Sequence, residues 1–312
     1  MLNFKKILLV GNGMLEVKNS LKHAVRLAYQ NQAKLDVLIV CPEFPKELSE
    51  YKPVFEFSVA EKFKHELKAT RSEIAPNESG VALNFKIEYN SVPSIYIIRH
   101  IIKNGYDLLI KDAETLNDER GFKAIDMDIL RKCPCPVWIS KTTHKNDHEK
   151  NIAVAIDPLS PTAEGHALSL HLLEISRSLA NAYNEKLKII SCWDYVFEEY
   201  LSKNMSFKVD AEDLARFVNT TSQHHHDALN QLIQESVITD NYEVAHVRGS
   251  PDEVIPQYIT ENSIDVLVMG TVGRTGIPGF VIGNTAENVL QNLNCSLIAI
   301  KPNGFMTPIK AY

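Results

Sequence analysis

The chain has 312 residues and a formal net charge of -6, and 45% of its residues are hydrophobic and 23% charged. This composition is typical of a soluble globular protein, and the length predicts two domains. The acidic balance argues against nucleic-acid binding, because neutralising phosphates requires a basic face. We find no apolar run of the roughly 18 residues that span a bilayer and no secretory signal pattern at the start. We therefore expect a cytoplasmic protein without a nucleic-acid or membrane partner.

An internal repeat of strand-like segments organises the chain. A continuous apolar run at residues 6–12 resembles a second run at 151–157, and each is followed by a turn and an amphipathic helical stripe. Four more strand-like segments follow in each half in the same order: 34–41, 83–89, 107–110 and 136–140, then 186–193, 242–247, 265–268 and 296–300. Strands that alternate with helices predict a mostly parallel sheet with helices on both faces.

The polar run at residues 141–150 separates the two copies and has no periodicity. We interpret it as a linker or exposed connection, so that the domains extend over about 1–143 and 150–312. Residues 302–312 predict an irregular tail. An apolar face or an edge strand from each half could join the domains as a tandem pseudo-dimer, in imitation of a two-fold homodimer.

The five cysteines suit a reducing compartment. Their number is odd, and the closest pair, Cys133 and Cys135, lacks both CxxC spacing and a second Cys/His pair at zinc-finger spacing. We interpret the cysteines as small buried apolar groups and not as disulfides or metal ligands.

Glycines gather after the fourth strand of the second half. Gly270, Gly273 and Gly276 follow this strand, and Gly283 precedes a predicted helix. Ligands of open α/β sheets bind beyond the carboxyl ends of the strands. Glycines allow a close backbone approach to an anion, and the N–H groups at a helix N-terminus favour negative charge. The pattern predicts a nucleotide or phosphate site; the alternative is that the glycines serve only turn and packing geometry.

Polar residues complete this candidate site. Asn284 and Thr285 could donate to phosphate oxygens or cap the helix, and Arg274 could supply a charged fork of donors. Asp157 ends the first strand of the same half and could accept a hydrogen bond from a ribose hydroxyl.

The spacing Gly270-x2-Gly273-x9-Gly283, followed by a small polar residue, resembles the nucleotide motif of the universal stress protein family. The match extends over residues 270–276 and 283–289, and the two-copy layout with the segment 130–138 is similar to tandem members of the family. The resemblance covers nearly the whole chain. It implies an α/β fold of two tandem flavodoxin-like (adenine nucleotide alpha hydrolase-like) domains, each a five-stranded parallel sheet with helices on both faces. It further implies a non-enzymatic cytoplasmic stress-response protein without catalytic residues or a metal site.

Carried over by position, the resemblance places Asp157 at the ribose or adenine and the backbone of Cys192 at the adenine. The implied nucleotide-binding residues are Asp157, Cys192, Met269, Gly270, Gly273, Arg274, Gly283, Asn284, Thr285 and Ala286. Asn284 stands where the family usually has Ser or Thr. The implied ligand is ATP or a related adenine nucleotide, which could carry Mg²⁺. Protein partners and a further homodimer are open.

The first half departs from this pattern. Asp112 stands in the place of Gly270, with Glu114 close by, and Asn12 stands in the place of Asp157. Carboxylates repel phosphate, and the loop that follows contains a single glycine, Gly121. We expect no nucleotide in this half, which could bind another ligand or serve only as a packing partner.

Three other clusters receive a structural interpretation. His224, His225, His226 and Asp227 fall in a helical window from 210 to 235 and are interpreted as a solvated face, since consecutive helical residues diverge. Glu198 and Glu199 are interpreted as solvated surface for the same reason. The apolar residues Phe55, Phe57, Val59, Phe63 and Leu67 predict the core face of a helix and its approach.

Two alternatives to nucleotide-binding stress protein stay open. The chain could be a scaffold or small-ligand-binding stress protein that binds no nucleotide, which Asn284 and the altered first half favour. It could instead be a weak ATP hydrolase, although no obvious metal-binding carboxylate or general base stands near the glycine loop.

Overall fold

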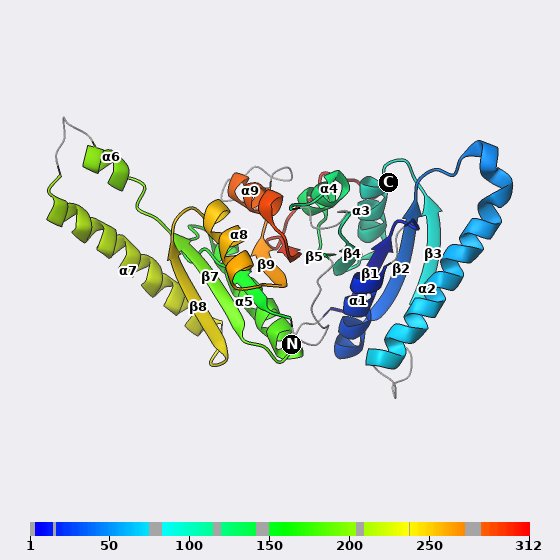
Figure 1. Cartoon of the computed structure of the whole chain (residues 1–312), viewed down its shortest axis with the longest axis horizontal. Helices are drawn as coiled ribbons and strands as arrows, with labels where there is room; N and C mark the ends of the chain where they lie inside the picture. The colour runs from blue at the N-terminus through cyan, green and yellow to red at the C-terminus, as the bar shows by residue number, and fades with distance from the viewer. Residues whose placement is uncertain are drawn as a thin grey trace.

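The computed structural model describes residues 4–14, 17–74, 83–114, 120–141, 150–203, 209–236, 238–271 and 282–312. The strands are β1 (Lys6–Gly11), β2 (Lys34–Cys41), β3 (Leu83–Tyr89), β4 (Leu108–Asp112), β5 (Val137–Ser140), β6 (Ile152–Ala155), β7 (Leu187–Trp193), β8 (Tyr242–Arg248), β9 (Val266–Gly270) and β10 (Ser296–Ile300). The helices are η1 (Lys46–Tyr51), α1 (Lys18–Asn31), α2 (Lys52–Ile74), α3 (Pro93–Asn104), α4 (Ala124–Lys132), α5 (Ala163–Ala182), α6 (Glu198–Lys203), α7 (Ala211–Glu235), α8 (Pro251–Glu261) and α9 (Asn284–Asn292). Figure 1 shows them in two halves that meet near β5.

The strands form one sheet in the order β3-β2-β1-β4-β5-β10-β9-β6-β7-β8. Within each half the strands are parallel. The order reverses between β1 and β4 in the first half and between β6 and β9 in the second. The α/β class and the two five-stranded units predicted from the sequence are confirmed.

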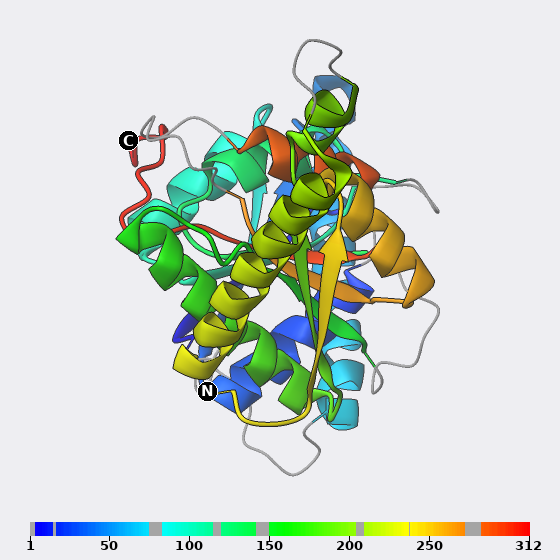
Figure 2. The same ribbon diagram turned by 90° about the vertical axis from the view of Figure 1, so that its left-hand side faces the viewer.

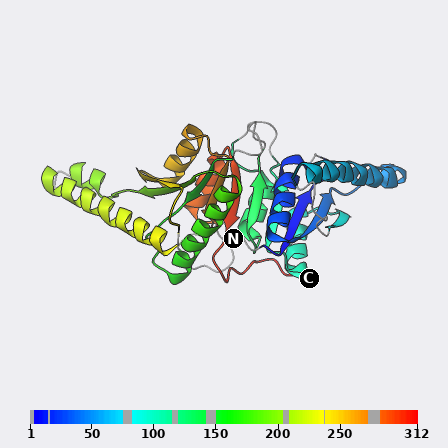
Figure 3. The ribbon, with the colours of Figure 1, turned by 90° about the horizontal axis from the view of Figure 1, so that it is seen from below.

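Helices cover both faces of this sheet, which explains why its inner strands are continuous apolar runs. Ile7 and Leu9 belong to a buried cluster with α1, α2, α5 and α7. Leu8 and Val10, which point to the opposite face, belong to a second cluster with α3, α4, α8 and α9. Each cluster draws residues from both halves. Figure 3 shows the halves side by side, with α2 and α7 reaching outward at opposite ends.

The two halves join through an antiparallel pair of edge strands. In this junction Trp138 of β5 lies opposite Ile298 of β10, flanked by the pairs Ile139–Leu297 and Val137–Ala299. The pairing leaves neither strand with an open edge, and it places the hydrophobic faces of both halves in one continuous layer.

Two buried lysines bridge the halves reciprocally at this junction. Lys301, which follows β10, donates from Nζ to the carbonyl oxygens of Leu130 at 2.7 Å and Cys133 at 2.8 Å. Lys141, which follows β5, donates from Nζ to the carbonyl oxygen of Leu293 at 2.7 Å. Each ammonium group therefore meets the carbonyl groups at the C-terminal end of a helix in the other half, α4 or α9, where the helix dipole favours positive charge. Burial lowers the pKa of Lys301 to about 8.

Several sequence expectations can be compared with these elements. Helix α7 matches the predicted helical window, and residues 302–312 contain neither helix nor strand. Phe63 and Leu67 of α2 are buried as expected, but Phe57 is 68% exposed, so its assignment to the core face is wrong. Most of the predicted linker, residues 142–149, lies outside the described residues. None of the described helices combines the length and apolar character needed to cross a membrane.

Candidate functional site

The candidate nucleotide site lies at the point where the strand order of the second half reverses. Asp157 follows β6, Cys192 lies near the end of β7, and Met269 and Gly270 end β9. Because β6, β7 and β9 are parallel neighbours, these residues share the carboxyl edge of the sheet. This is the edge at which open α/β sheets bind ligands. Gly273 and Arg274 of the predicted site lie outside the described residues.

The N-terminus of α9 lies directly beside the end of β9. The backbone N–H of Gly283, which is the N-cap residue of α9, donates to the carbonyl oxygen of Thr271 at 3.2 Å. Asn284 and Thr285 are exposed in the first turn, followed by half-buried Ala286, and no described side chain caps the helix. The first turn therefore presents backbone N–H groups and the positive end of the helix dipole toward the carboxyl edge of the sheet.

An acidic residue in this first turn is neutralised from the other half. Glu287 forms a short ion pair with Arg131 at the end of α4. The pair removes most of the repulsion that an unpaired carboxylate would exert on an anion at this helix end.

The other members of the predicted site have ordinary structural surroundings. Asp157 is exposed, and its Oδ1 accepts a hydrogen bond from the backbone N–H of Leu159 at 3.0 Å. Met269 is buried in the core, and burial raises the pKa of the Cys192 thiol to about 11, so that thiol is neutral. A Cβ atom at Gly270 would lie 3.1 Å from Leu168 of α5. Close helix–strand packing is thus one reason for glycine at this position.

A histidine pair beside this site, formed by a buried and a half-buried imidazole, contradicts one sequence interpretation. His225 of α7 is 5% exposed, and its Nδ1 lies 3.0 Å from Nε2 of His246 on β8. Figure 2 shows α7 running obliquely beside β8. Burial lowers the pKa of both imidazoles, and the Asp157 charge partly opposes the effect at His225. The interpretation of residues 224–227 as a solvated face is wrong for His225. The missed signal was its place on the helical stripe of Val218, Leu229 and Leu232, which are also buried.

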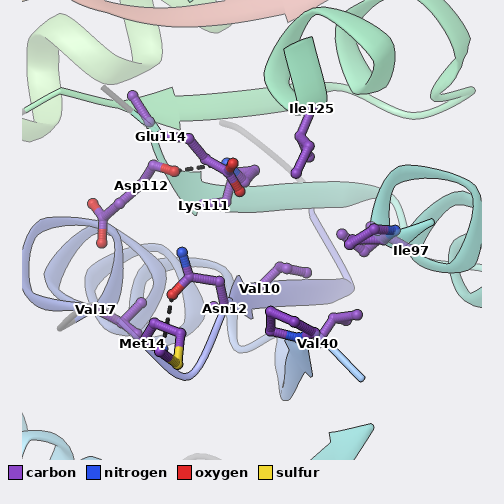
Figure 4. Close-up of a pocket in the computed structure, with 14 residues that line it drawn as sticks. Val10, Asn12, Met14, Val17, Val40, Ile97, Lys111, Asp112, Glu114 and Ile125 are labelled. Atoms are coloured by element: carbon purple, nitrogen blue, oxygen red, sulfur yellow. Dashed lines mark hydrogen bonds and ion pairs between the residues drawn. The ribbon is translucent and has the colours of Figure 1, made fainter. Parts of the chain in front are cut away.

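The corresponding point of the first half, between β1 and β4, contains a pocket (Figure 4). The cavity has a volume of about 160 Å³. Asn12 and Asp112 line it, which places both residues where the sequence comparison of the two halves expects them. A carboxylate therefore occupies the position that Gly270 holds in the second half.

Asp112 is held in place by the first helix. Its Oδ1 accepts a hydrogen bond from the backbone N–H of Ser20 at 3.0 Å, and its Oδ2 accepts one from the Ser20 hydroxyl at 2.7 Å. Burial nevertheless raises the pKa of Asp112 from 3.8 to about 6, because desolvation of the charge outweighs these bonds.

Replacing Asp112 with Asn is expected to stabilise the protein at alkaline pH. Between pH 3.8 and about 6 the folded chain binds more protons at Asp112 than the unfolded chain, so stability falls as the pH rises through this window. Asn keeps an acceptor for the Ser20 N–H and carries no charge. We expect the free energy of unfolding to increase by about 1–3 kcal/mol at pH 8 and by less near pH 4. Thermal melts across this range measure the effect; an equal gain at both pH values would contradict it.

Comparison with known proteins identifies the family to which the chain belongs. The profile of the Universal stress protein family matches residues 3–141 and 149–301. The chain therefore belongs to the universal stress protein family, in its tandem form, and has a role in stress response.

The chain is similar to several universal stress proteins of known sequence or structure. Universal stress protein E of Photorhabdus laumondii is 31% identical over 239 residues, which cover 75% of this chain and 74% of that protein. The Universal stress protein E homolog of Haemophilus influenzae is 29% identical and covers 97% of this chain and 99% of its own length. The crystal structure of a putative universal stress protein from Pseudomonas aeruginosa has a TM-score of 0.69 and 22% identity, with 97% of this chain and 95% of that chain covered. This structural likeness confirms the fold.

Proposed function

We propose that the protein binds ATP or a related adenine nucleotide in its C-terminal half and acts in the stress response by binding and not by catalysis, in the cytoplasm. The observation that carries the proposal is the position of the α9 N-terminus against the end of β9. Backbone N–H groups and the helix dipole meet there at the point where the strand order reverses. The same place in the first half holds Asp112, which disfavours phosphate there.

The described residues suit the parts of a nucleotide in different ways. The first turn of α9, at Asn284, Thr285 and Ala286, would hold phosphate oxygens through backbone N–H groups. Asp157 would accept a hydrogen bond from a ribose hydroxyl, and the backbone near Cys192 would contact the adenine. Mg²⁺, where present, would arrive with the phosphates, since Mg²⁺ keeps most of its waters and prefers phosphate oxygens.

A scaffold without a nucleotide is the second candidate function. The close packing of Gly270 against Leu168 explains why glycine stands at this position without the need for a ligand. In this reading the protein would act through protein partners, either as the single chain or as a homodimer.

Replacing Gly283 with Asp is expected to weaken ATP binding by about 100-fold, because a carboxylate would stand among the phosphates. Aspartate is a favourable N-cap residue, so α9 should keep its structure. Isothermal titration calorimetry of the full chain measures the affinity, and mass spectrometry of the purified protein identifies any nucleotide retained from the cell.

Val92→Asp is the matched control, since it places the same carboxylate at the N-cap of α3 in the other half, where Val92 is exposed. Unchanged ATP affinity in Gly283→Asp would place the nucleotide elsewhere. No binding of millimolar ATP to the original protein would favour the scaffold, and release of phosphate above background would favour an ATP hydrolase.

A further inference from the structure

The pocket of the N-terminal half has one apolar end and one charged end. Val40 and Ile97 lie at the apolar end, while Lys111, Asp112 and Glu114, at and just after the end of β4, line the other side, with the Asp112 carboxylate turned toward Ser20 of α1 (Figure 4). Val10, Val17 and Ile125 contribute further apolar walls. Such a cavity separates the environment of a polar head group from that of an apolar body.

Lys111 does not make the charged end positive. Its Nζ donates to the carbonyl oxygen of Asp112 at 2.8 Å and forms a short ion pair with Asp126, which is completely buried. The second carboxylate oxygen of Asp126 accepts the backbone N–H of Glu114 at 2.9 Å. Lys111 and Asp126 thus neutralise each other, and a further ion pair of Lys111, with Glu114, is longer, at 3.8 Å. The charges of Asp112 and Glu114 are left in excess.

Glu114 lines the pocket and pairs with Lys111 more loosely than Asp126 does. Its Oε1 lies 3.8 Å from Nζ of Lys111, which is beyond hydrogen-bond distance, and its side chain is 24% exposed. Ionised carboxylates only accept hydrogen bonds. The head group that complements Asp112 and Glu114 is therefore a donor, and a positively charged donor gains most in this partly desolvated place.

The size of the cavity limits the apolar body. A dry cavity of about 150 Å³ is large enough for benzene, and this pocket has about 160 Å³. One ring, or an aliphatic chain of similar volume, fits between Val10, Val40 and Ile97. A nucleoside triphosphate exceeds this space and has the wrong charge.

We propose that the N-terminal pocket binds a small organic cation, a primary ammonium group on an apolar body of about one ring, with Asp112 and Glu114 as acceptors for the ammonium. The two halves then have opposite ligand preferences, an anion in the second half and a cation in the first. This proposal is independent of nucleotide binding in the second half.

Binding should depend on pH through the carboxylates. Burial raises the pKa of Asp112 to about 6 and raises the pKa of Glu114. The charged groups around Asp112 are Lys111, which opposes the increase, and Glu66 of α2, which adds to it. An aliphatic ammonium keeps its proton throughout this range, so affinity should rise with pH as the two carboxylates ionise.

Benzylamine is the probe, and benzyl alcohol and benzoate are its neutral and anionic analogues. In calorimetric titrations of the full chain we expect benzylamine to bind about tenfold more tightly at pH 8 than at pH 5, and at least about tenfold more tightly than benzyl alcohol. Benzoate should give no binding. Asp112→Asn and Glu114→Gln should each weaken benzylamine binding about tenfold, whereas Glu61→Gln, an exposed carboxylate on α2, should leave it unchanged.

Thermal melts establish that each variant is folded. The proposal is overturned if benzylamine does not bind at millimolar concentration, or if benzyl alcohol or benzoate binds equally well. It is also overturned if neither Asp112→Asn nor Glu114→Gln changes the affinity, or if saturating ATP displaces benzylamine and Gly283→Asp abolishes its binding, which would place the amine in the second half.

Discussion

Replacing Trp138 with Ala is expected to lower the free energy of unfolding by about 3–5 kcal/mol. Trp138 is 1% exposed on β5, at the strand pair that joins the two halves. Its ring stacks on His23 of α1 at 4.4 Å between centroids, and Nδ1 of His23 lies 3.0 Å from the hydroxyl of Tyr183 in the second half. The substitution would leave a large cavity where the halves meet, so chemical denaturation should show a lower midpoint for the whole chain.

Trp138→Phe is the matched control. The indole Nε1 of Trp138 is buried and has no hydrogen-bond partner among the described residues, so Phe gives up packing volume but also removes an unsatisfied donor. We expect a loss of only about 1–2 kcal/mol for this variant. If the free energy of unfolding of Trp138→Ala lay within about 1 kcal/mol of that of the original protein, Trp138 would not pack the junction as described.

Replacing Ala299 with Pro is expected to lower the free energy of unfolding by about 3 kcal/mol or more. Ala299 lies in β10, where it pairs with Val137 of β5 on one side and with Met269 of β9 on the other. Proline has no N–H to donate and is not accommodated in the middle of a sheet. Because β10 has a strand on each side, the substitution disturbs the ladder at the centre of all ten strands.

Ala299→Ser separates this backbone effect from a change in side-chain volume, since Ser is of similar size and keeps the N–H. We expect Ser to cost about 1–2 kcal/mol through burial of its hydroxyl, clearly less than Pro. Urea denaturation measures both. Equal stability of the Pro and Ser variants would contradict the central position of β10.

The main strands and helices, and their order along the chain, could be predicted from the sequence. The strand predicted at 34–41 coincides with β2, the strand at 83–89 with β3, and the helical window at 210–235 with α7. These agreements have a common cause. Parallel strands covered on both faces are continuous apolar runs, and long amphipathic helices repeat with a period of 3.6 residues, so both patterns are local.

The junction between the halves could be anticipated only in outline. The residues of β5 and β10 are buried throughout, and burial of this kind results equally from a strand neighbour or from a covering helix. Antiparallel pairing of Trp138 with Ile298 depends on the position of the whole second half, which no local pattern encodes. The reciprocal contacts of Lys141 and Lys301 follow from that pairing and were likewise invisible in the sequence.

Site residues that follow from aligning the two repeats could be predicted from the sequence, whereas their contacts with other elements could not. The comparison of the two repeats predicted that Asp112 occupies the position equivalent to Gly270. Each residue indeed ends the strand of its half, β4 or β9, beside which the strand order reverses. The second reason for Gly270, its contact with Leu168, needed the packing of α5. The burial of His225 could have been predicted from its place on the apolar stripe of α7. Its contact with His246 could not, because His246 lies on another element.

The central claim is that the two halves of this universal stress protein have different sites. Equilibrium dialysis of the full chain against ATP tests this claim most directly. We predict saturation at one ATP per chain, with loss of that binding in Gly283→Asp and its retention in Val92→Asp. Saturation at two ATP per chain, or one ATP that Gly283→Asp retains and Val92→Asp loses, would contradict the account.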